Sequence, residues 1–425
     1  MKKNTANIHE HAPVVQQLQK LLAKSPKMEA TLLASLKVAA YKAKTELDSD
    51  LYNGINDEFQ GNGWPTTIEN YYNYLDSYVR LVPNERIDPN YPNAWRSTSD
   101  KNGYNQKVYD LLCQFYWLVD QPAPNSDKTM QSFEKFADWL VDFSVAWGEF
   151  LDTTDSLTKE SLRSFKFNPM YNYPLYADNE KSWTTFNQFF YRDFNKARKK
   201  TGISPLRPIA APTDNNIITS PADCTFKAIY PIDKKGNVLE TTGDKAKITL
   251  KHTHTIGTVQ ELLNNSKYAD DFNEGTFVHY FLGPFDYHRF HTPIAGKVLE
   301  VADISGKVFL DVNMVDGQFD APDNAGGGYE FRQARGLVIV DGGKKIGKVA
   351  ILPIGMAQVS GVEMYTKLEG KKVGKGQEFG RFKFGGSDII MLFQKNPDLY
   401  LFQNDPGHNP IHFQYGQVAA YWEIE

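Results

Sequence analysis

Two segments far apart in the sequence carry the side chains that are best suited to chemistry. The first is residues 286–293, Asp-Tyr-His-Arg-Phe-His-Thr-Pro, which contains His288 and His291. The second ends in Ser387, which follows a pair of glycines. A serine is a weak nucleophile until a neighbouring base removes its proton, and glycines beside it let an attacking group approach closely. The pattern therefore predicts a histidine that activates a serine.

The elements that position these side chains change along the chain from helices to strands. In residues 9–165, apolar side chains recur at spacings of three and four, as they do from Phe133 to Phe150, which is typical of amphipathic helices. Short strand-like runs separated by glycine turns follow from residue 205 onward. These runs are 275–282, 296–303, 336–341, 346–354, 389–394 and 417–423. The sequence therefore predicts the α+β fold class.

Three regions are expected along the chain. Residues 1–165 are predicted to form a helical N-terminal domain, and residues 166–204 a connecting helical segment with an aromatic helix around Trp183–Phe194. Residues 205–425 are predicted to form a mostly β, barrel-sandwich-like catalytic domain. A chain of 425 residues is long enough for more than one hydrophobic core, which supports this division.

The composition is that of a globular protein and excludes several classes. Hydrophobic residues make up 41% and charged residues 23% of the chain, with a formal net charge of -4. Such mild acidity argues against a nucleic-acid partner, which requires a basic face. Because the chain has only two cysteines, it has too few for a disulfide framework or a thiolate zinc site. No signal peptide or spanning segment is recognisable, so we expect a cytoplasmic protein without stable membrane insertion.

Two other site types are considered for the histidine-rich part of the chain. Five of the nine histidines lie between His252 and His291, which invites a metal site. A metal-binding β-barrel would place a glutamate four or five residues after a His-x-His pair, whereas Glu261 comes seven residues after His254. The phrases around 292–298 and 373–380 are similar to carriers of biotin or lipoate, but no lysine stands at a hairpin tip. We therefore expect no metal and interpret the carrier-like phrases as barrel architecture.

The bond between Gly386 and Ser387 has a chemistry of its own. The serine Oγ can attack the preceding carbonyl, which converts the peptide bond into an ester. Elimination then breaks the chain and leaves dehydroalanine, which hydrolyses to a pyruvoyl group. The ketone of such a group forms a Schiff base with an amine and accepts electrons from a breaking C–C bond. This is the chemistry that an amino-acid decarboxylase without pyridoxal phosphate needs.

The sequence resembles the phosphatidylserine decarboxylase family of pyruvoyl enzymes. The resemblance covers roughly residues 183–394 and consists of phrases in the order that the family has them. These phrases are Phe186–Arg192, Arg207-Pro208, Ser220–Asp223, Gly275–Phe277, Asp286–Pro293 and Gly376–Ser387. Six phrases in the same order make a chance agreement improbable.

The resemblance implies a role for each candidate site residue. Asp223 corresponds to the acid of the family's triad, His291 to its base and Ser387 to the residue that becomes pyruvoyl. His291 would deprotonate Ser387 while Asp223 orients the imidazole. His288 corresponds to a histidine near the substrate, where it would protonate the carbanion left by carbon dioxide.

The resemblance also implies the processing and the cofactor. Cleavage between Gly386 and Ser387 would give a large chain, 1–386, and a small chain, 387–425, that begins with the covalent pyruvoyl group. Neither pyridoxal phosphate nor a metal is implied. Two departures from the family stand beside these residues: Cys224 replaces a glycine after Asp223, and Asp388 replaces the usual threonine after Ser387. A carboxylate at Asp388 would either slow self-cleavage or assist it, so an uncleaved binding relative stays an alternative.

The substrate is predicted from the N-terminal region. The phrases Trp64-Pro65 and Ala146–Leu151 and the Gly-Gly-Ser form of the cleavage site are similar to the soluble L-tryptophan decarboxylase branch. We therefore expect a soluble aromatic amino acid as the small-molecule substrate, with phosphatidylserine as the alternative. Relatives are often dimers, which predicts a homodimer.

Overall fold

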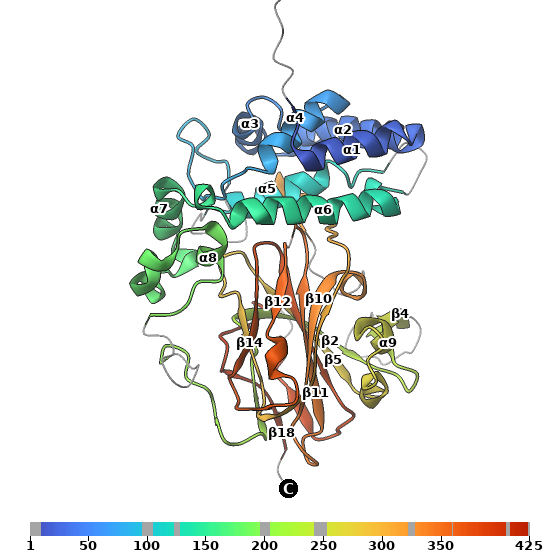
Figure 1. Ribbon diagram of the computed structural model, residues 1–425, viewed down its shortest axis with the longest axis vertical. Coiled ribbons are helices and arrows are strands. Elements are labelled where there is room, and N and C mark those ends of the chain that lie inside the picture. The colour runs from blue at the N-terminus through green and yellow to red at the C-terminus, as the bar shows by residue number, and fades with distance from the viewer. Residues whose placement is uncertain are drawn as a thin grey trace, which may run out of the picture.

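The structure is a computed structural model that describes residues 10–95, 105–122, 128–195, 205–241, 253–321, 328–358, 360–404 and 409–423. Figure 1 shows a layer of helices that caps one end of a taller body of strands. Helix α6 (Glu134–Leu151) lies at the boundary, between the other helices and the strand ends. The expected α+β class is confirmed, with helices first and a mostly antiparallel β region after them.

The helical layer is built from amphipathic segments with recognisable starts. Proline occupies the first turn of two helices, where its missing N–H costs no hydrogen bond. Asp48 and Thr158 accept hydrogen bonds from backbone N–H groups at the start of two others. The remaining long helices are α1 (Pro13–Ala23), α2 (Pro26–Glu46), α3 (Ser49–Glu58), α4 (Ile68–Tyr78), α5 (Lys107–Trp117) and α7 (Lys159–Phe167). The apolar stripe from Phe133 to Phe150 lies on α6, as predicted.

The connecting segment is less helical than its aromatic residues suggested. Short 3₁₀ turns occupy Pro169–Tyr171, Tyr173–Leu175 and Ala177–Ser182. Helix α8 covers only Phe186–Phe190, because Thr185 caps its start and Tyr191 leaves helical geometry at its end. The aromatic side chains pack into the core instead of extending the helix.

The β region is organised around one eight-stranded antiparallel sheet. Its strand order is β13-β7-β10-β11-β15-β5-β2-β17. The bounds, in that order, are Lys372–Val373, Gly296–Ile304, Ala334–Asp341, Lys348–Gly355, Ser387–Phe393, Thr276–Leu282, Cys224–Pro231 and His412–Phe413. The central strands read as continuous apolar runs because both faces of the sheet are covered.

Smaller sheets and two short elements complete the β region. One sheet contains β12 (Val362–Met364), β14 (Glu378–Phe382) and β6 (Arg289–His291), and another contains β1 (Ile217–Thr219), β18 (Val418–Trp422) and β16 (Leu399–Leu401). Two further pairs are β3 (Asn237–Thr241) with β4 (Thr253–Thr258) and β8 (Asn313–Val315) with β9 (Gln318–Asp320). The short elements are helix α9 (Val259–Leu262) and the 3₁₀ turn η8 (Tyr329–Phe331).

The two faces of the central sheet belong to different cores. Ile389, Met391 and Phe393 of β15 join a core that also contains the helical layer. Ile390 and Leu392 of the same strand join a second core, with α9 and part of β10 and β11. Successive side chains of a strand point to opposite faces, so each residue of β15 belongs to one core or the other.

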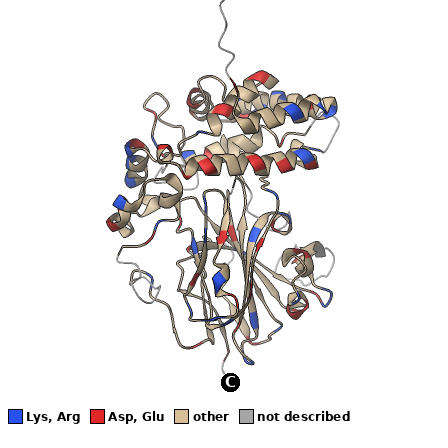
Figure 2. Ribbon diagram, viewed as in Figure 1, with Lys and Arg blue, Asp and Glu red and all other residues tan. Residues whose placement is uncertain are grey.

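Charge and hydropathy of the helices add two observations. In Figure 2, acidic and basic residues are interspersed along the helices that face the viewer. Within the residues that the structure describes, no helix combines the length and the apolar character needed to cross a bilayer.

Candidate active site

Ser387 is the first residue of β15, in the middle of the central sheet. It is fully buried and pairs with Gly355 of β11 on one side and with Leu282 of β5 on the other. Gly385, two residues earlier, has φ +148°, and a Cβ on Gly386 would lie 3.1 Å from the Cβ of Met356. The turn before Ser387 therefore depends on both glycines.

The peptide bond before Ser387 is held by the loop that follows β11. The Met356 N–H donates a hydrogen bond of 2.8 Å to the carbonyl oxygen of Gly386, and the Gly386 N–H donates one of 3.1 Å to Ala357. The Ser387 Oγ lies 3.4 Å from the carbonyl oxygen of Gly385. A donor on a carbonyl oxygen stabilises the negative charge that develops there when a nucleophile attacks the carbon. The geometry suits attack on the Gly386 carbonyl.

His291 ends β6 and is almost completely buried. Its ring stacks on Tyr415 with the centroids 3.9 Å apart. Nδ1 lies 3.0 Å from the carbonyl oxygen of Gly376, and Nε2 lies 3.3 Å from the hydroxyl of Tyr287. Since a carbonyl only accepts, the contact assigns the ring proton to Nδ1 and leaves Nε2 as the basic nitrogen.

Asp223 lies just before β2 and is buried beside a cation. Its carboxylate accepts hydrogen bonds from Nη2 of Arg207 at 2.7 Å and from Nε at 3.3 Å. The N–H of Tyr415 donates a third, at 2.9 Å. Tyr415 therefore links the two predicted triad residues, because its ring covers His291 and its backbone binds Asp223.

The register of the sheet brings Asp223 and Ser387 to the same end. Asp388 pairs with Phe281 of β5, and Phe281 pairs on its other side with Thr225 of β2. Asp223, just before β2, and Ser387, at the start of β15, therefore lie at the same end of the sheet. Because β5 lies between these two strands, β2 and β15 are on the order of 10 Å apart. The register thus brings two of the predicted residues, Asp223 and Ser387, to the same end of the sheet.

His288 lies in an aromatic environment. Its ring stacks on Phe190 at 3.8 Å and meets the edge of Phe382 at 6.3 Å. Both ring nitrogens are buried without a hydrogen-bond partner among the described residues. Burial, with the charge of Arg192 as a smaller cause, holds the pKa of His288 well below its usual value. The ring is therefore neutral near pH 7 and has two nitrogens available to a ligand.

Asp388 turns away from the bond that precedes Ser387. It is fully buried on the other face of the sheet, where the Tyr329 hydroxyl donates a hydrogen bond of 2.7 Å to Oδ2. His279 Nε2 lies 3.3 Å from the same oxygen. Burial raises the pKa of the neighbouring Glu330 to about 8, against an opposing effect of His279.

The helical layer contacts the segment before Ser387 directly. Trp147 of α6 meets the ring of Phe384 edge-on at 5.2 Å. Asn187 of α8 accepts a hydrogen bond of 3.0 Å from the Phe384 N–H and donates one of 2.9 Å to Asp152. Lys383 pairs with Asp152 at 2.7 Å. The helices are thus part of the framework that positions the serine turn.

Sequence reasoning missed several of these contacts. Met356 acts through its backbone, which leaves no trace in the residue type. Tyr415 and Tyr329 are single tyrosines among 23, with no motif around them. Arg207 stands in a phrase of the resemblance, but only the structure identifies Asp223 as its partner.

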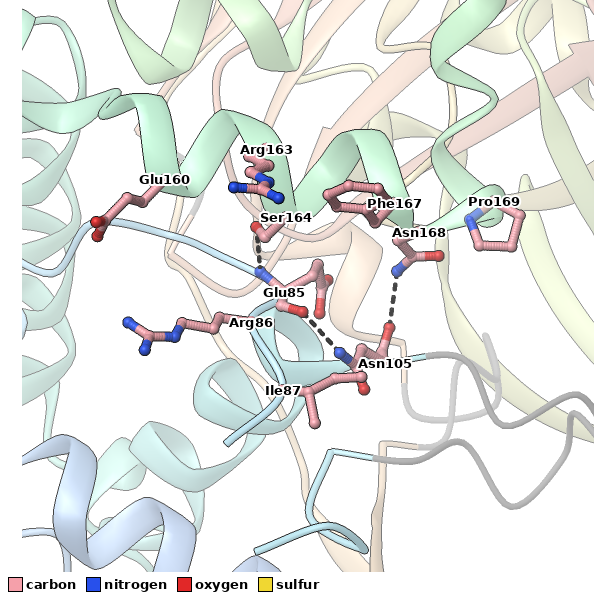
Figure 3. A pocket seen from close by; sticks show the side chains of 10 residues that line it. All are labelled: Glu85, Arg86, Ile87, Asn105, Glu160, Arg163, Ser164, Phe167, Asn168 and Pro169. Carbon is pink, nitrogen blue, oxygen red and sulfur yellow. Dashed lines mark hydrogen bonds between the residues drawn. The ribbon is translucent and has the colours of Figure 1, made fainter. Parts of the chain in front are cut away.

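A separate cavity of about 540 Å³ lies in the helical region. Figure 3 shows the side chains around it, with the Glu85 N–H bonded to Ser164 and Asn168 bonded to the carbonyl of Asn105. Its lining combines exposed apolar groups, such as Phe167, with two arginines, Arg86 and Arg163. None of the predicted site residues lines this cavity.

The side chains around Ser387 suit a serine-derived group. Among the side chains that the structure describes, no group of three His, Cys, Asp or Glu residues is placed to hold a metal ion. His252 lies outside the described residues. A buried serine after two glycines, with an N–H on the preceding carbonyl, fits the precursor of a pyruvoyl group.

Comparison with known proteins gives a consistent result. The family model described as phosphatidylserine decarboxylase matches residues 186–419. A phosphatidylserine decarboxylase proenzyme of Fusobacterium nucleatum is 28% identical over 240 residues, which cover 56% of this chain and 69% of that protein. One of Clostridium novyi is 29% identical over 297 residues, which cover 68% and 87%. The decarboxylase iboD of Amanita muscaria is 27% identical over 279 residues, which cover 58% and 74%.

The matched segment begins at α8, ends in β18 and contains Asp223, His288, His291 and Ser387. It spans more than half of the chain and leaves the helical layer outside, apart from α8. The chain therefore belongs to the phosphatidylserine decarboxylase family and is a decarboxylase.

Proposed function

We propose that the chain cleaves itself between Gly386 and Ser387 and then uses the resulting pyruvoyl group to decarboxylate a soluble aromatic amino acid. The observation that carries the proposal is the turn at Ser387. There the Gly386 carbonyl accepts the Met356 N–H at 2.8 Å and the serine is fully buried. A preorganised donor on this carbonyl supports attack by the adjacent hydroxyl.

The cleavage needs no oxidant or reductant. Ser387 Oγ adds to the carbonyl carbon of Gly386, and the C–N bond breaks to leave an ester and a free amine. The Cα proton of residue 387 is then removed while Gly386 departs as a carboxylate. The dehydroalanine that remains takes up water and releases ammonia, which leaves the pyruvoyl group at the start of the small chain.

His291 is the base of this proposal. Its Nε2 is the basic nitrogen, because Nδ1 faces the carbonyl of Gly376. Asp223, which is paired with Arg207, binds the backbone of Tyr415, and the ring of Tyr415 stacks on His291. Negative charge close to an imidazole favours the imidazolium that forms when the serine proton is removed.

His288 is assigned to turnover rather than to processing. Once formed, the pyruvoyl group supplies a carbonyl that condenses with the substrate amine and takes up the electron pair of the bond to the carboxylate. A substrate carboxylate beside His288 would favour its protonated form. His288 would then return this proton to the carbon that has lost carbon dioxide.

An aromatic amino acid is the proposed substrate class. The apolar rings of Phe190 and Phe382 around His288 support it, because small-molecule sites consist mostly of apolar walls with few polar groups. One relative, iboD, is named as a decarboxylase without a lipid in its name, which leaves room for a substrate other than phosphatidylserine. The names of the bacterial relatives favour phosphatidylserine as the second candidate. A dissolved substrate would agree with a cytoplasmic location.

Intact-mass analysis of freshly expressed protein tests the processing. We expect two chains, 1–386 and 387–425, with the small chain beginning in a pyruvoyl group, and a single chain for Ser387→Ala. A single unmodified species with full decarboxylase activity contradicts the mechanism. A single species without activity favours the uncleaved binding relative.

The substrate is tested with the cleaved protein. Tryptophan, tyrosine and phenylalanine are compared with phosphatidylserine vesicles for release of carbon dioxide. Cyanoborohydride in the presence of the substrate traps the amine on the small chain, where mass mapping locates it. If carbon dioxide is released from phosphatidylserine vesicles but from none of the three amino acids, phosphatidylserine is the substrate.

A further inference from the structure

The loop after β11 is the direct support of the bond before Ser387. Met356 donates to the Gly386 carbonyl, and Ala357 accepts from the Gly386 N–H. The loop continues into Gln358, which has φ +53°. A residue other than glycine in this conformation costs about 1–2 kcal/mol, so it needs support from its surroundings.

That support comes from two tyrosines of the helical layer. The Gln358 N–H donates a hydrogen bond of 3.0 Å to the hydroxyl of Tyr116, which itself donates one of 2.6 Å to the carbonyl of Val308. The hydroxyl of Tyr78 lies 3.0 Å from Oε1 of Gln358. Tyr116 belongs to α5 and Tyr78 to α4, so two helices meet at one strained loop residue.

Both tyrosines are fully buried. Burial raises the pKa of each phenol above its usual value, so the hydroxyl groups keep their protons over the whole working range of pH. Satisfied hydrogen bonds in such surroundings restrict a loop strongly, because breaking one leaves a buried polar group unpaired. The pair therefore fixes Gln358, and through it the direction of the Met356 N–H.

We propose that Tyr116 and Tyr78 are positioning residues for self-cleavage, which hold the Met356 N–H on the carbonyl oxygen that Ser387 attacks. The proposal rests on the proposed cleavage at Gly386-Ser387 and gives the helical layer a part in it. The oxyanion that forms at Gly386 is stabilised only if its donor is already in place. The two helices that carry these tyrosines lie outside the segment matched by the family model. They thus position the oxyanion donor from outside that segment.

The test compares two buried tyrosines whose hydroxyl groups have different partners. Tyr116→Phe removes the acceptor of the Gln358 N–H. Tyr74→Phe is the matched control, since Tyr74 is equally buried and its hydroxyl bonds Gln114 within the helical layer at 2.6 Å. Both proteins are made by pulse-labelled cell-free translation, and conversion of the precursor into two chains is followed on denaturing gels. We expect cleavage to slow about tenfold or more in Tyr116→Phe and to stay near the wild-type rate in Tyr74→Phe.

A second comparison separates positioning from a general loss of stability. Glycine adopts a positive φ without strain, so Gln358→Gly needs less support from Tyr116. The slowing caused by Tyr116→Phe is expected to be clearly smaller in the Gln358→Gly background than in the wild type. It is also expected to be the same at every pH, since no titrating group is removed.

The outcomes distinguish this proposal from the one on which it rests. If the wild type cleaves and Tyr116→Phe cleaves as fast as Tyr74→Phe, the positioning role is wrong and self-processing stands. Equal slowing in both Gln358 backgrounds also overturns the positioning role. A wild type that never cleaves between 386 and 387 overturns both proposals.

Discussion

Ser387 and Asp388 are neighbours in β15, yet their side chains enter different cores of the protein. Ser387 shares a face with Ile389 and the core beneath the helices, whereas Asp388 shares one with Ile390 and is held by Tyr329. The sheet therefore stands between the carboxylate and the serine hydroxyl. A negative charge that looks adjacent in the sequence is kept on the far face.

Asp388→Asn is expected to cleave at a rate within a few-fold of the wild type. The amide keeps an oxygen for the Tyr329 hydroxyl and removes a charge that does not face the serine. Asp388→Ala, by contrast, removes the acceptor of the Tyr329 hydroxyl and is expected to lose about 1–3 kcal/mol of folding free energy. Gel analysis of cleavage and denaturant unfolding measure the two effects. A change in cleavage rate above tenfold in Asp388→Asn would show that the carboxylate acts on the reaction.

The two histidines are expected to serve different steps, His291 the self-cleavage and His288 the decarboxylation of the substrate. His291→Ala removes the base and should leave a single uncleaved chain. His288→Ala should still give two chains, but release of carbon dioxide should fall by about a hundredfold or more, since a hundredfold is the lower end of the usual contribution of a proton-transfer residue. Mass analysis and carbon dioxide release are measured on the same samples. His11→Ala, which alters a histidine bonded to Asp76 in the helical region, is the control and should change neither.

The parts of the fold that periodicity determines could be predicted from the sequence. The run 389–394 became β15 at 387–393, and the apolar stripe from Phe133 to Phe150 became α6. The alternation of side chains in β15 also predicts that Asp388 faces away from Ser387, because neighbouring residues in a strand point to opposite faces of the sheet. The sequence interpretation considered only its distance along the chain.

The support of the site could not be predicted in this way. Gln358 and Tyr116 are 242 positions apart, and no local sequence pattern predicts a hydrogen bond between residues so far apart. The oxyanion donor is a backbone N–H, which any residue at Met356 would provide. The triad residues were named by resemblance, and their partners Arg207 and Tyr415 follow only from the tertiary contacts of the structure.

Glu330 is expected to make the protein less stable at alkaline pH. Its pKa rises from 4.5 to about 8, chiefly by burial, so the folded state holds a proton that the unfolded state loses between these values. The stability from this proton is complete below pH 4.5 and is lost as the pH rises through about 8. Glu330→Gln should therefore match the wild type near pH 5 and exceed it above pH 8 by a few kcal/mol at most. Denaturant unfolding at the two pH values measures this, with the exposed Glu274→Gln as a control that should show no such difference. Equal stability of Glu330→Gln and wild type above pH 8 would mean that Glu330 ionises freely.

The buried pair of Arg207 and Asp223 gives the last prediction. Arg207→Met leaves the Asp223 carboxylate in the protein interior with only the Tyr415 N–H as partner, so folding free energy should fall by about 3–5 kcal/mol. Adding Asp223→Asn removes the unpaired charge, and the double variant should recover part of this loss. Denaturant unfolding of the wild type, both single variants and the double variant measures the coupling. Because the imidazolium of His291 depends on negative charge at Asp223, cleavage should stay slow in the double variant although its stability recovers. Full recovery of cleavage together with stability would show that Asp223 serves the fold alone.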